Sequence, residues 1–409
     1  MNFNTSLLHG KAVKRYEHGA TLPAVIQTNA FRYNSAEELE NVFNHKAMGY
    51  AYSRVANPTV AAFEQRINEL EHGNAAVGCS SGMTAILLSL MNILSSGDEV
   101  IASSGLYGGS IDLFEDMVNF GIKVRFVDDM TVDNIEPLFN EHTRAVFGEV
   151  ISNPSLRIMD IRALSELSHS NGVPLIVDST TATPYLINPI DHGADIVVHS
   201  TTKYINGSGD SIGGVIIDGA HFPWDFDKFK AMSYYRKFGK VAYTVRLRTD
   251  IAENLGGYMP PLTAFLNVIG LETLGLRMDR ICSNAAKLAN ALSEIPGLQV
   301  NYPLLSDGNN IRLAKEQMKG KGGGILTFNP GSKEKAFKII NELKYAVKAT
   351  SIGDVRTLVI HPSSTLYIRS TETQKKAAGV YEDTVRVSVG IEDIEDLIDD
   401  FTSVIKKHI

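Results

Sequence analysis

The stretch VPLIVDSTTATPYLINPIDHGADIVVHSTTKYINGSGDS, residues 173–211, decides the fold of this chain. It contains two apolar runs, one closed by Asp178 and the other by Ser200-Thr201-Thr202-Lys203. Short apolar runs rich in β-branched residues and separated by turn-forming residues predict buried strands of a parallel sheet. Ligand sites of such sheets lie at the carboxyl ends of the strands, so we expect Asp178 and Lys203 to face one crevice.

A carboxylate and an amine beside buried strands are costly to leave unpaired. Asp178 and Lys203 therefore either form a salt bridge with each other or hold a charged ligand together. Pyridoxal phosphate (PLP) fits the second case, because its aldehyde condenses with a lysine, its ring nitrogen pairs with an acid and its phosphate accepts hydrogen bonds. Ser200 and Thr202 offer hydroxyls to such a phosphate. The spacing alone leaves the ion pair and the cofactor equally open.

Composition narrows the class of protein. The chain has 409 residues, 44% of them hydrophobic and 21% charged, which is enough for two or three domains of a soluble globular protein. A formal charge of −7 without a Lys/Arg cluster argues against a nucleic-acid partner. Cys79 and Cys282 are the only cysteines, so no disulfide framework is expected.

The sequence shows neither a metal-binding motif nor a targeting segment. The eleven histidines show no HExxH spacing, and no metal centre is predicted. The first residues lack the pattern of a signal peptide, and no apolar run approaches the ~18 residues of a membrane span. We therefore expect a cytoplasmic enzyme with no membrane partner.

The order of predicted elements divides the chain into three parts. Residues 1–57 predict a polar arm with one helix, which starts at the capping box Ser35-Ala36-Glu37-Glu38. Such an arm either crosses to a neighbouring subunit or lies on its own surface. Residues 58–258 alternate strands with helices, which predicts a mainly parallel sheet covered on both faces. Residues 259–409 predict a smaller α+β domain.

Two further segments give local predictions, one for a helix and one for a loop-rich stretch. Asn57-Pro58-Thr59 predicts the start of a helix, and Gly73 predicts its end after His72. The segment 219–250 is rich in aromatic and charged residues with weak periodicity, so we expect loops and a short helix there.

The turn Gly78-Cys79-Ser80-Ser81-Gly82 follows a predicted strand and precedes an apolar helix. A helix N-terminus after a turn of small residues is a ready anion site, because its free N–H groups and dipole favour negative charge. The same residues match the GxSxG pattern of a serine hydrolase using Ser80. That alternative needs a later acid and histidine, for which only His361 stands in a suggestive place, and it leaves Asp178 and Lys203 without a role.

Arg386 lies in the predicted strand 384–389, on the face it shares with Ser388. Arginine is the usual fork for a carboxylate, and each charged hydrogen bond is worth about 1.5–3 kcal/mol. The alternative is a solvated strand residue, which a lone arginine would favour.

Taken together, seven motifs resemble the Cys/Met-metabolism PLP-dependent enzymes, the transsulfuration group of the fold-type I, or aspartate-aminotransferase-like, superfamily. They occur in the family's order over nearly the whole chain. In this sequence they are Tyr52-Ser53-Arg54 with Asn57-Pro58-Thr59, Ser81-Gly82-Met83, Leu106-Tyr107-Gly108-Gly109, Asn153-Pro154, Asp178-Ser179-Thr180, Ser200-Thr201-Thr202-Lys203 and Arg386-Val387-Ser388-Val389-Gly390.

The resemblance implies a role for each matching residue. Lys203 would carry PLP as a Schiff base and later move protons, Asp178 would pair with the ring nitrogen, and Tyr107 would stack on the ring. Arg386 would clamp the substrate carboxylate, with Ser351 and Asn153 nearby. The remaining cofactor-binding positions implied by the family are Ser81, Gly82, Met83, Thr180, Ser200 and Thr202 around the phosphate and ring, Asn153 at the ring hydroxyl, and Tyr52 and Arg54 contributed by a neighbouring subunit.

Such a shared site implies a homotetramer built from active dimers. Within the family the chain is most similar to the O-acetylhomoserine sulfhydrylases, or homocysteine synthases, notably in residues 182–186, 192–200 and 211–215. That similarity implies replacement of the γ-acetate group of O-acetyl-L-homoserine by sulfide or a small thiol.

The chain departs from the family pattern in a few places that bear on substrate entry. Ser179-Thr180-Thr181 replaces the commoner Asn-Thr-Phe, Leu366-Tyr367 replaces Thr-His, Ile368-Arg369 replaces Gln-Leu, and the segment 219–250 is shorter than in many sulfhydrylases. Methionine γ-lyase remains an alternative, although Gly109 stands where that enzyme usually carries a cysteine. Cystathionine γ-synthase and γ-lyase are further alternatives within the family.

Overall fold

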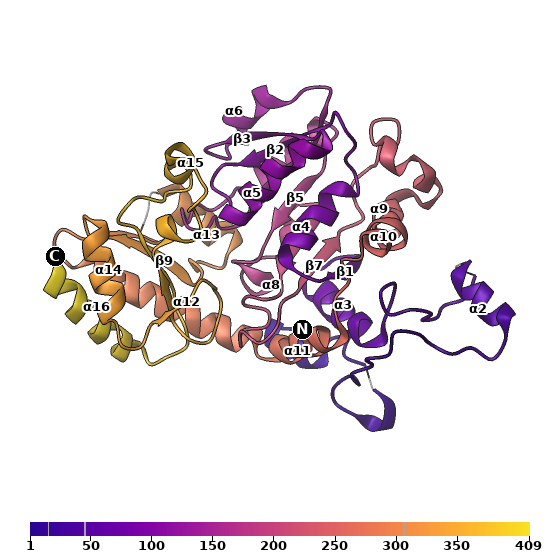
Figure 1. Ribbon diagram of the computed structural model, residues 1–409, viewed down its shortest axis with the longest axis horizontal. Helices are drawn as coiled ribbons and strands as arrows, with labels where there is room; N and C mark the ends of the chain where they lie inside the picture. The colour runs from indigo at the N-terminus through magenta and orange to yellow at the C-terminus, as the bar shows by residue number, and fades with distance from the viewer. Residues whose placement is uncertain (15, 45, 306–307) are drawn as a thin grey trace.

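The computed structural model describes residues 1–14, 16–44, 46–305 and 308–409. It contains a seven-stranded sheet and a five-stranded sheet, each covered by helices, with an N-terminal arm that extends away from both (Figure 1). The predicted α/β class, a mainly parallel sheet followed by a smaller α+β unit, is confirmed.

The larger sheet has the order β1-β7-β6-β5-β4-β2-β3. Neighbouring strands pair in parallel from β3 to β6, whereas β7 runs antiparallel to both β6 and β1. The carboxyl ends of β4, β5 and β6 therefore meet at one edge of the sheet. The strands are β1 (Ala75–Cys79), β2 (Glu99–Ser103), β3 (Lys123–Val127), β4 (Thr143–Glu149), β5 (Leu175–Asp178), β6 (Ile196–Ser200) and β7 (Gly214–Asp218).

Capping side chains start the helices around this sheet, and among them Asn57 was predicted. Asn57 accepts a hydrogen bond from Thr59 N at the start of α3, Ser81 accepts one from Thr84 N at α4, and Asp160 accepts one from Ala163 N at α7. The helical segments here are α3 (Pro58–Leu70), α4 (Gly82–Met91), α5 (Gly108–Asp116), η2 (Met117–Phe120), α6 (Val132–Ile135), η3 (Glu136–Leu138), α7 (Ile161–Ser170), α8 (Thr183–Leu186) and η4 (Pro189–His192).

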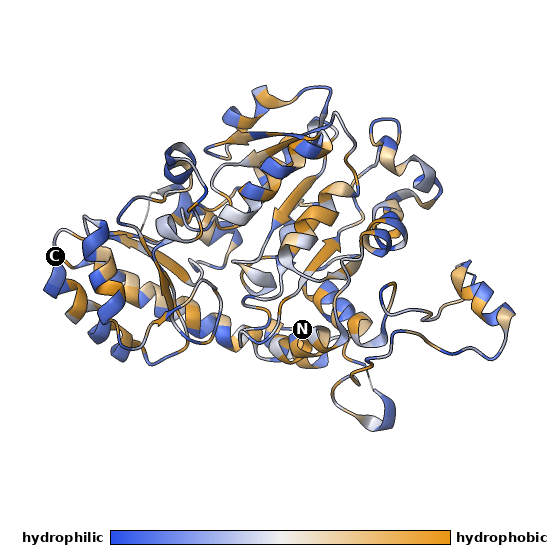
Figure 2. Cartoon of the chain, in the orientation of Figure 1, coloured by the Kyte–Doolittle hydropathy of each residue, from blue (hydrophilic) through white to orange (hydrophobic). Residues whose placement is uncertain are grey.

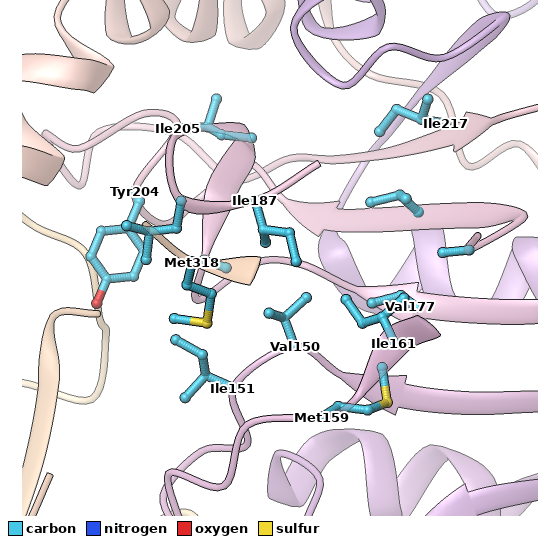
Figure 3. Close-up of a cluster of buried hydrophobic side chains, with 14 of the residues drawn as sticks. Val150, Ile151, Met159, Ile161, Val177, Ile187, Tyr204, Ile205, Ile217 and Met318 are labelled. Atoms are coloured by element: carbon cyan, nitrogen blue, oxygen red, sulfur yellow. The ribbon is translucent and has the colours of Figure 1, made fainter. Parts of the chain in front are cut away.

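Apolar side chains from the two faces of this sheet fill two separate cores. Figure 3 shows one of them, in which Val150, Val177 and Ile217 lie among side chains from the flanking helices and loops. Met318, from the C-terminal half of the chain, and Tyr204, just after β6, join the same core. In Figure 2 the strands are predominantly hydrophobic while the outer helices alternate, as burial of one helix face requires.

The five-stranded sheet has the order β10-β11-β12-β9-β8. The long helical pattern that begins near Pro261 is two helices, α11 and α12, broken at Thr273. Helix α11 packs on α3, whereas α12 packs on α16, β8 and β9, so the proposed boundary after residue 258 stays a prediction. The elements are α11 (Pro261–Glu272), α12 (Leu274–Ser293), β8 (Gln299–Asn301), α13 (Gly308–Gln317), β9 (Ile325–Asn329), α14 (Lys333–Glu342), β10 (Val347–Lys348), β11 (Leu358–Ile360), η7 (Pro362–Ser364), α15 (Glu372–Ala377), β12 (Val385–Ser388) and α16 (Ile394–His408).

Two local predictions are wrong. Helix α3 ends at Leu70, and His72 rather than Gly73 takes the left-handed conformation, with φ of +58°. The second is wrong in the extent of helix: residues 219–229 of the segment 219–250 are loop as expected, but helical turns run from Lys230 to Leu255, with a break at Gly239. Less helix was expected because most of the run is 3₁₀ or π helix, which lacks the 3.6-residue period. The run comprises η5 (Lys230–Val241), α9 (Ala242–Arg246), η6 (Leu247–Ala252) and α10 (Glu253–Leu255).

The N-terminal arm contains more helix than predicted. The expected helix is α2 (Ala36–Phe43), where Ser35 accepts from Glu38 N, and it lies apart from the rest of the chain (Figure 1). Two further segments, α1 (Phe3–His9) and η1 (Glu17–Gly19), precede it. Helix α1 packs against α3, α11 and α12, so the first residues dock on the body while α2 does not. Among the described residues, no helix is long and apolar enough to cross a membrane.

The core under α5 provides a test of this packing. Phe147 on β4 is fully buried and meets Phe114 of α5 edge to face, with ring centroids 5.1 Å apart. We expect Phe147→Ala to destabilise the protein by about 3–5 kcal/mol, measured as a lower midpoint of urea unfolding, because it leaves a cavity against the sheet. The control Phe120→Ala removes an exposed ring and should change stability by no more than about 0.5 kcal/mol. Equal midpoints for the two variants would contradict the packing described.

Candidate active site

A cavity of about 270 Å³ opens at the edge where β4, β5 and β6 end. Asp178, the last residue of β5, and Lys203, three residues after β6, both line it. The other predicted residues on its wall are Ser81, Gly82, Met83, Tyr107, Asn153, Thr180, Ser200, Thr202 and Arg386. The topology explains this assembly, because parallel strands deliver their carboxyl ends to the same edge.

Hydrogen bonds from neighbouring residues fix Asp178 at the carboxyl end of β5. Its Oδ1 accepts a hydrogen bond of 2.9 Å from Thr180 N, and Thr180 Oγ1 accepts one of 2.8 Å from Ser200 N. Thr180 thus ties the end of β5 to the end of β6. Burial raises the pKa of Asp178 above its ordinary value, although the hydrogen bonds from Thr180 oppose the shift. A cationic ligand group in the cavity would lower the pKa of Asp178 again.

Lys203 has no acid beside its amine in the described part of the chain. Its Nζ donates a 3.1 Å hydrogen bond to Ser351 Oγ, which brings Ser351 to the site from the C-terminal half. Burial, together with the positive charge of Arg386, lowers the pKa of Lys203 to about 8. About a tenth of the amine is therefore unprotonated and nucleophilic at pH 7, far more than for an ordinary lysine.

The N-terminus of α4 forms a small polar wall of the cavity. Ser81 caps the helix, and the first-turn N–H groups of Gly82 and Met83 have no acceptor within the helix itself. A Cβ at Gly82 would lie 2.5 Å from Ser200 Cβ, so only glycine allows the helix to approach the end of β6 this closely. The hydroxyls of Ser200 and Thr202 line the same region. This arrangement favours an anion.

Arg386 lies on β12 with only 2% of its surface exposed, so the alternative of a solvated strand residue is wrong. Its Nη2 donates to the backbone oxygens of Thr350 and Ser351 at 3.2 and 3.1 Å, and its Nη1 donates to Asn153 Oδ1 at 3.3 Å. Its Nε is buried without a partner, and no carboxylate of the described chain pairs with it. Burial lowers its pKa to about 10. A buried guanidinium without an acidic partner favours binding of a ligand carboxylate.

Glu149 also lines this cavity, and the sequence analysis did not single it out. It ends β4 directly opposite Asp178 in the register of the sheet, and its Oε1 and Oε2 accept from Tyr107 N at 2.8 Å and Asn153 N at 3.1 Å. Burial and the neighbouring charge of Asp178 raise its pKa well above the ordinary value. One carboxylate thereby orients both loops that carry predicted ligand-binding side chains. The signal was available, since Glu149 closes an apolar run as Asp178 does.

At the departure Leu366-Tyr367, the tyrosine side chain lies in the interior. Tyr367 is fully buried, and its hydroxyl donates to Leu106 O at 2.9 Å and lies 3.1 Å from Asn153 O. It thus links the loop before Tyr107 to the loop of Asn153. Its phenol lies behind these loops and does not line the cavity, so the effect of this departure on substrate entry stays a prediction.

Two predicted cofactor residues lie outside the cavity of their own chain. Tyr52 and Arg54 stack on each other with 5.4 Å between guanidinium and ring centroid, and Arg54 Nη1 donates to Glu253 O. Neither lines the Lys203 cavity. The fold does not bring these two side chains to the other predicted ligands within one chain.

The serine hydrolase alternative has no geometric support. Ser80 Oγ is engaged with Thr84 Oγ1 at 3.0 Å. His361, the suggested base, uses its two ring nitrogens on Ser364 Oγ and Glu382 O, at 2.9 and 2.8 Å. The described chain therefore presents no nucleophile–base pair at this turn.

Known proteins resemble the chain over its whole length. The homocysteine synthase of Schizosaccharomyces pombe is 37% identical over 421 residues, covering 99% of this chain and 98% of that protein. The L-methionine gamma-lyase of Fusobacterium nucleatum is also 37% identical, with 98% of both chains covered. A solved structure of a putative O-acetylhomoserine (thiol)-lyase from Campylobacter jejuni, which contains N'-pyridoxyl-lysine-5'-monophosphate, matches with a TM-score of 0.94, 32% identity and coverage of 99% and 100%.

The family model for Cys/Met metabolism PLP-dependent enzymes matches residues 4–406. With this match across nearly the whole chain, and a cavity that joins a lysine, an acid and an anion site at one sheet edge, the protein belongs to the Cys/Met metabolism family of PLP-dependent enzymes.

Proposed function

We propose that this protein catalyses the PLP-dependent replacement of the γ-acetate of O-acetyl-L-homoserine by sulfide or a small thiol, giving L-homocysteine or L-methionine. The observation that carries the proposal is the buried guanidinium of Arg386, which has no carboxylate partner in the described chain and lies in the cavity of Lys203 and Asp178. An amino-acid carboxylate supplies the missing charge. The names of the relatives supply the reaction class.

The residues around the cavity fit PLP. When bound, PLP supplies an aldehyde that links to amines and a ring that withdraws electrons from the linked amino acid. Asp178 would hold a proton on the ring nitrogen, and a positive ring favours its ionised form despite burial. The N–H groups of Gly82 and Met83, with the hydroxyls of Ser200 and Thr202, would bind the phosphate. Tyr107, which lines the wall, would stack on the ring.

Lys203 is the candidate proton carrier. A pKa of about 8 lets its amine take up and release a proton near neutral pH, as removal of the α-proton and handling of the β-proton require. The hydrogen bond to Ser351 Oγ orients the amine. Asn153 and Arg386 are joined by their own hydrogen bond, so the substrate carboxylate and the cofactor ring would be held by connected groups.

Position 109 supports a sulfhydrylase over a methionine γ-lyase. A Cβ at Gly109 would lie 2.7 Å from Cε1 of Tyr107, so any side chain there would have to move the aromatic ring. The space beside Tyr107 therefore differs from that of an enzyme with a cysteine at this position. Overall identity does not separate the two activities, since a homocysteine synthase and a methionine γ-lyase are equally similar to this chain.

The same proposal includes a homotetramer of active dimers. Tyr52 and Arg54 stand outside the cavity of their own chain, and the arm around α2 is largely exposed, with Phe43 and Met48 facing solvent. In a dimer this arm would bring Tyr52 and Arg54 to the neighbour's phosphate site. A cytoplasmic location is also proposed, since Cys79 and Cys282 are buried free thiols.

The reaction is tested by comparing products. O-Acetyl-L-homoserine plus sulfide should give homocysteine and acetate, whereas L-methionine alone should release 2-oxobutyrate at a rate at least about tenfold lower, measured as kcat/KM. Release of 2-oxobutyrate from methionine at a comparable rate would instead assign a γ-lyase.

Arg386 is tested by substitution in the holoenzyme. Arg386→Met should lower kcat/KM for O-acetyl-L-homoserine by at least about 100-fold, because two charged hydrogen bonds together contribute about 3 kcal/mol or more. Arg386→Lys keeps the positive charge but loses the paired N–H donors of the guanidinium, so its kcat/KM should lie between those of wild type and Arg386→Met. Bound PLP, measured by absorbance, should remain in both variants. Full activity of Arg386→Met would contradict the carboxylate role.

The lowered pKa of Lys203 predicts how the apoenzyme takes up PLP. Only the neutral amine attacks the aldehyde, so the reconstitution rate should rise about tenfold per pH unit below pH 8 and level off above it. Arg386→Met removes a positive charge that lowers this pKa, so the curve should shift to higher pH. The control Arg312→Met removes an exposed arginine and should leave the curve unchanged. A wild-type rate that keeps rising to pH 10 would contradict the prediction.

A further inference from the structure

A second cluster of ligand-type side chains lies at the opposite edge of the same sheet. It consists of His169 on α7, Asp195 just before β6, and His221 just after β7. One donor atom from each residue lies within 4.8 Å of those of the other two. Ser200 lies five positions after Asp195 along extended strand, so the cluster is about 17 Å from the end of β6 and outside the cofactor cavity.

The carboxylate of Asp195 is deeply buried, and each of its two oxygens contacts a histidine ring nitrogen. The residue is 1% exposed, and its Oδ2 accepts from Leu175 N and contacts His169 Nε2, both at 2.8 Å. Its Oδ1 lies 2.9 Å from His221 Nε2, a contact that is an ion pair when the imidazole is protonated. Within the described chain both atoms are buried without a hydrogen-bond partner. A buried oxygen and a buried ring nitrogen side by side, neither with a hydrogen-bond partner, could both coordinate one metal ion.

The charge around the cluster favours a dication. Asp218, which ends β7, lies close enough to both Asp195 and His221 to influence their charges. Burial, with a contribution from Asp195, raises the pKa of Asp218 to about 6, and its oxygens accept from Thr244 Oγ1 and Ala220 N. Asp218 therefore remains largely ionised at neutral pH while its own oxygens are occupied. It adds negative potential without competing as a ligand.

We propose that His169, Asp195 and His221 form a binding site for a divalent transition-metal ion of the zinc class. Two imidazoles and one carboxylate select zinc, cobalt or nickel over magnesium or calcium, which prefer oxygen ligands. Tetrahedral bonds of about 2.0–2.1 Å place donor atoms about 3.3 Å apart, so the present contacts need to open by roughly 0.5 Å. The imidazole side chains are 33% and 37% exposed, which leaves room for water as a fourth ligand.

The competing account is a proton-mediated ion pair. Asp195 raises the pKa of His221, which is the direction expected for an imidazolium held by a carboxylate. The two accounts are mutually exclusive at a given moment, because a metal ion displaces the proton from each Nε2.

The site would act as a structural clip. It joins α7, the start of β6 and the loop after β7, three segments far apart in the sequence. His169 also contacts the ring of Phe222 at 5.7 Å between centroids, and Phe222 packs edge to face on Trp224 and Phe229. A bound ion would stabilise the folded chain in proportion to its occupancy and would anchor the beginning of the segment 219–250.

The test uses holoenzyme stripped of metal and titrated with zinc chloride against a chromophoric chelator. Wild type should bind one zinc ion per chain, with a rise in the thermal unfolding midpoint and no change in the visible spectrum of the cofactor. His169→Gln and His221→Gln should each weaken binding at least about tenfold and abolish the rise in midpoint. Magnesium chloride should not compete. X-ray anomalous scattering at the zinc edge should locate the ion at Asp195.

His72→Gln is the matched control. His72 also contacts an aspartate, with Nδ1 at 2.8 Å from Asp191 Oδ2, but it belongs to no three-residue cluster in the described chain. Its zinc binding should equal that of wild type. Retention of one tight zinc ion by the double variant H169Q/H221Q would overturn the site, as would a wild type without zinc binding at 100-fold excess over chain. Unfolding midpoints of the metal-free variants, compared with metal-free wild type, separate loss of binding from loss of folding.

Discussion

Burial of charge at the carboxyl edge of the larger sheet is the constraint on which the rest of this structure depends. Desolvation raises the pKa values of Asp178 and Glu149 and lowers those of Lys203 and Arg386. Neither cation pairs with a carboxylate in the part of the chain described. A fold tolerates such groups only where function requires them, because each unpaired buried charge costs several kcal/mol. Ligand charges can offset that cost.

Strand register and hydrogen bonds fix the positions of these four ionisable side chains. Register sets Glu149 beside Asp178 on adjacent parallel strands, and Thr180 links β5 to β6 through Ser200 N. The C-terminal half supplies the remaining wall, with Ser351 on Lys203 and Arg386 on Asn153. The site is therefore built from both sheets, and its geometry depends on how they pack. Tyr367 reinforces that packing by joining the loops of Leu106 and Asn153 from inside.

The two ends of β6 carry different chemistry. At its carboxyl end lie Ser200 and the turn to Lys203, whereas Asp195 at its start meets His169 and His221. The strand itself is fully apolar and buried from Ile196 to Val198. A rigid apolar strand with polar groups at both ends holds these two clusters about 17 Å apart.

The sequence by itself determined the α/β class, the parallel strands around Asp178 and Lys203, and the helix that follows the turn of residues 78–82. These features depend on residues close together in the chain, through hydrophobic period and capping. Only the tertiary structure decided that Arg386 is buried, that Glu149 orients two loops, that residues 230–255 are helical, and that Tyr367 lies inside. It also brought His169, Asp195 and His221 together across 52 residues. Burial and pairing of polar groups depend on contacts between distant segments, and local pattern carries no information about those contacts.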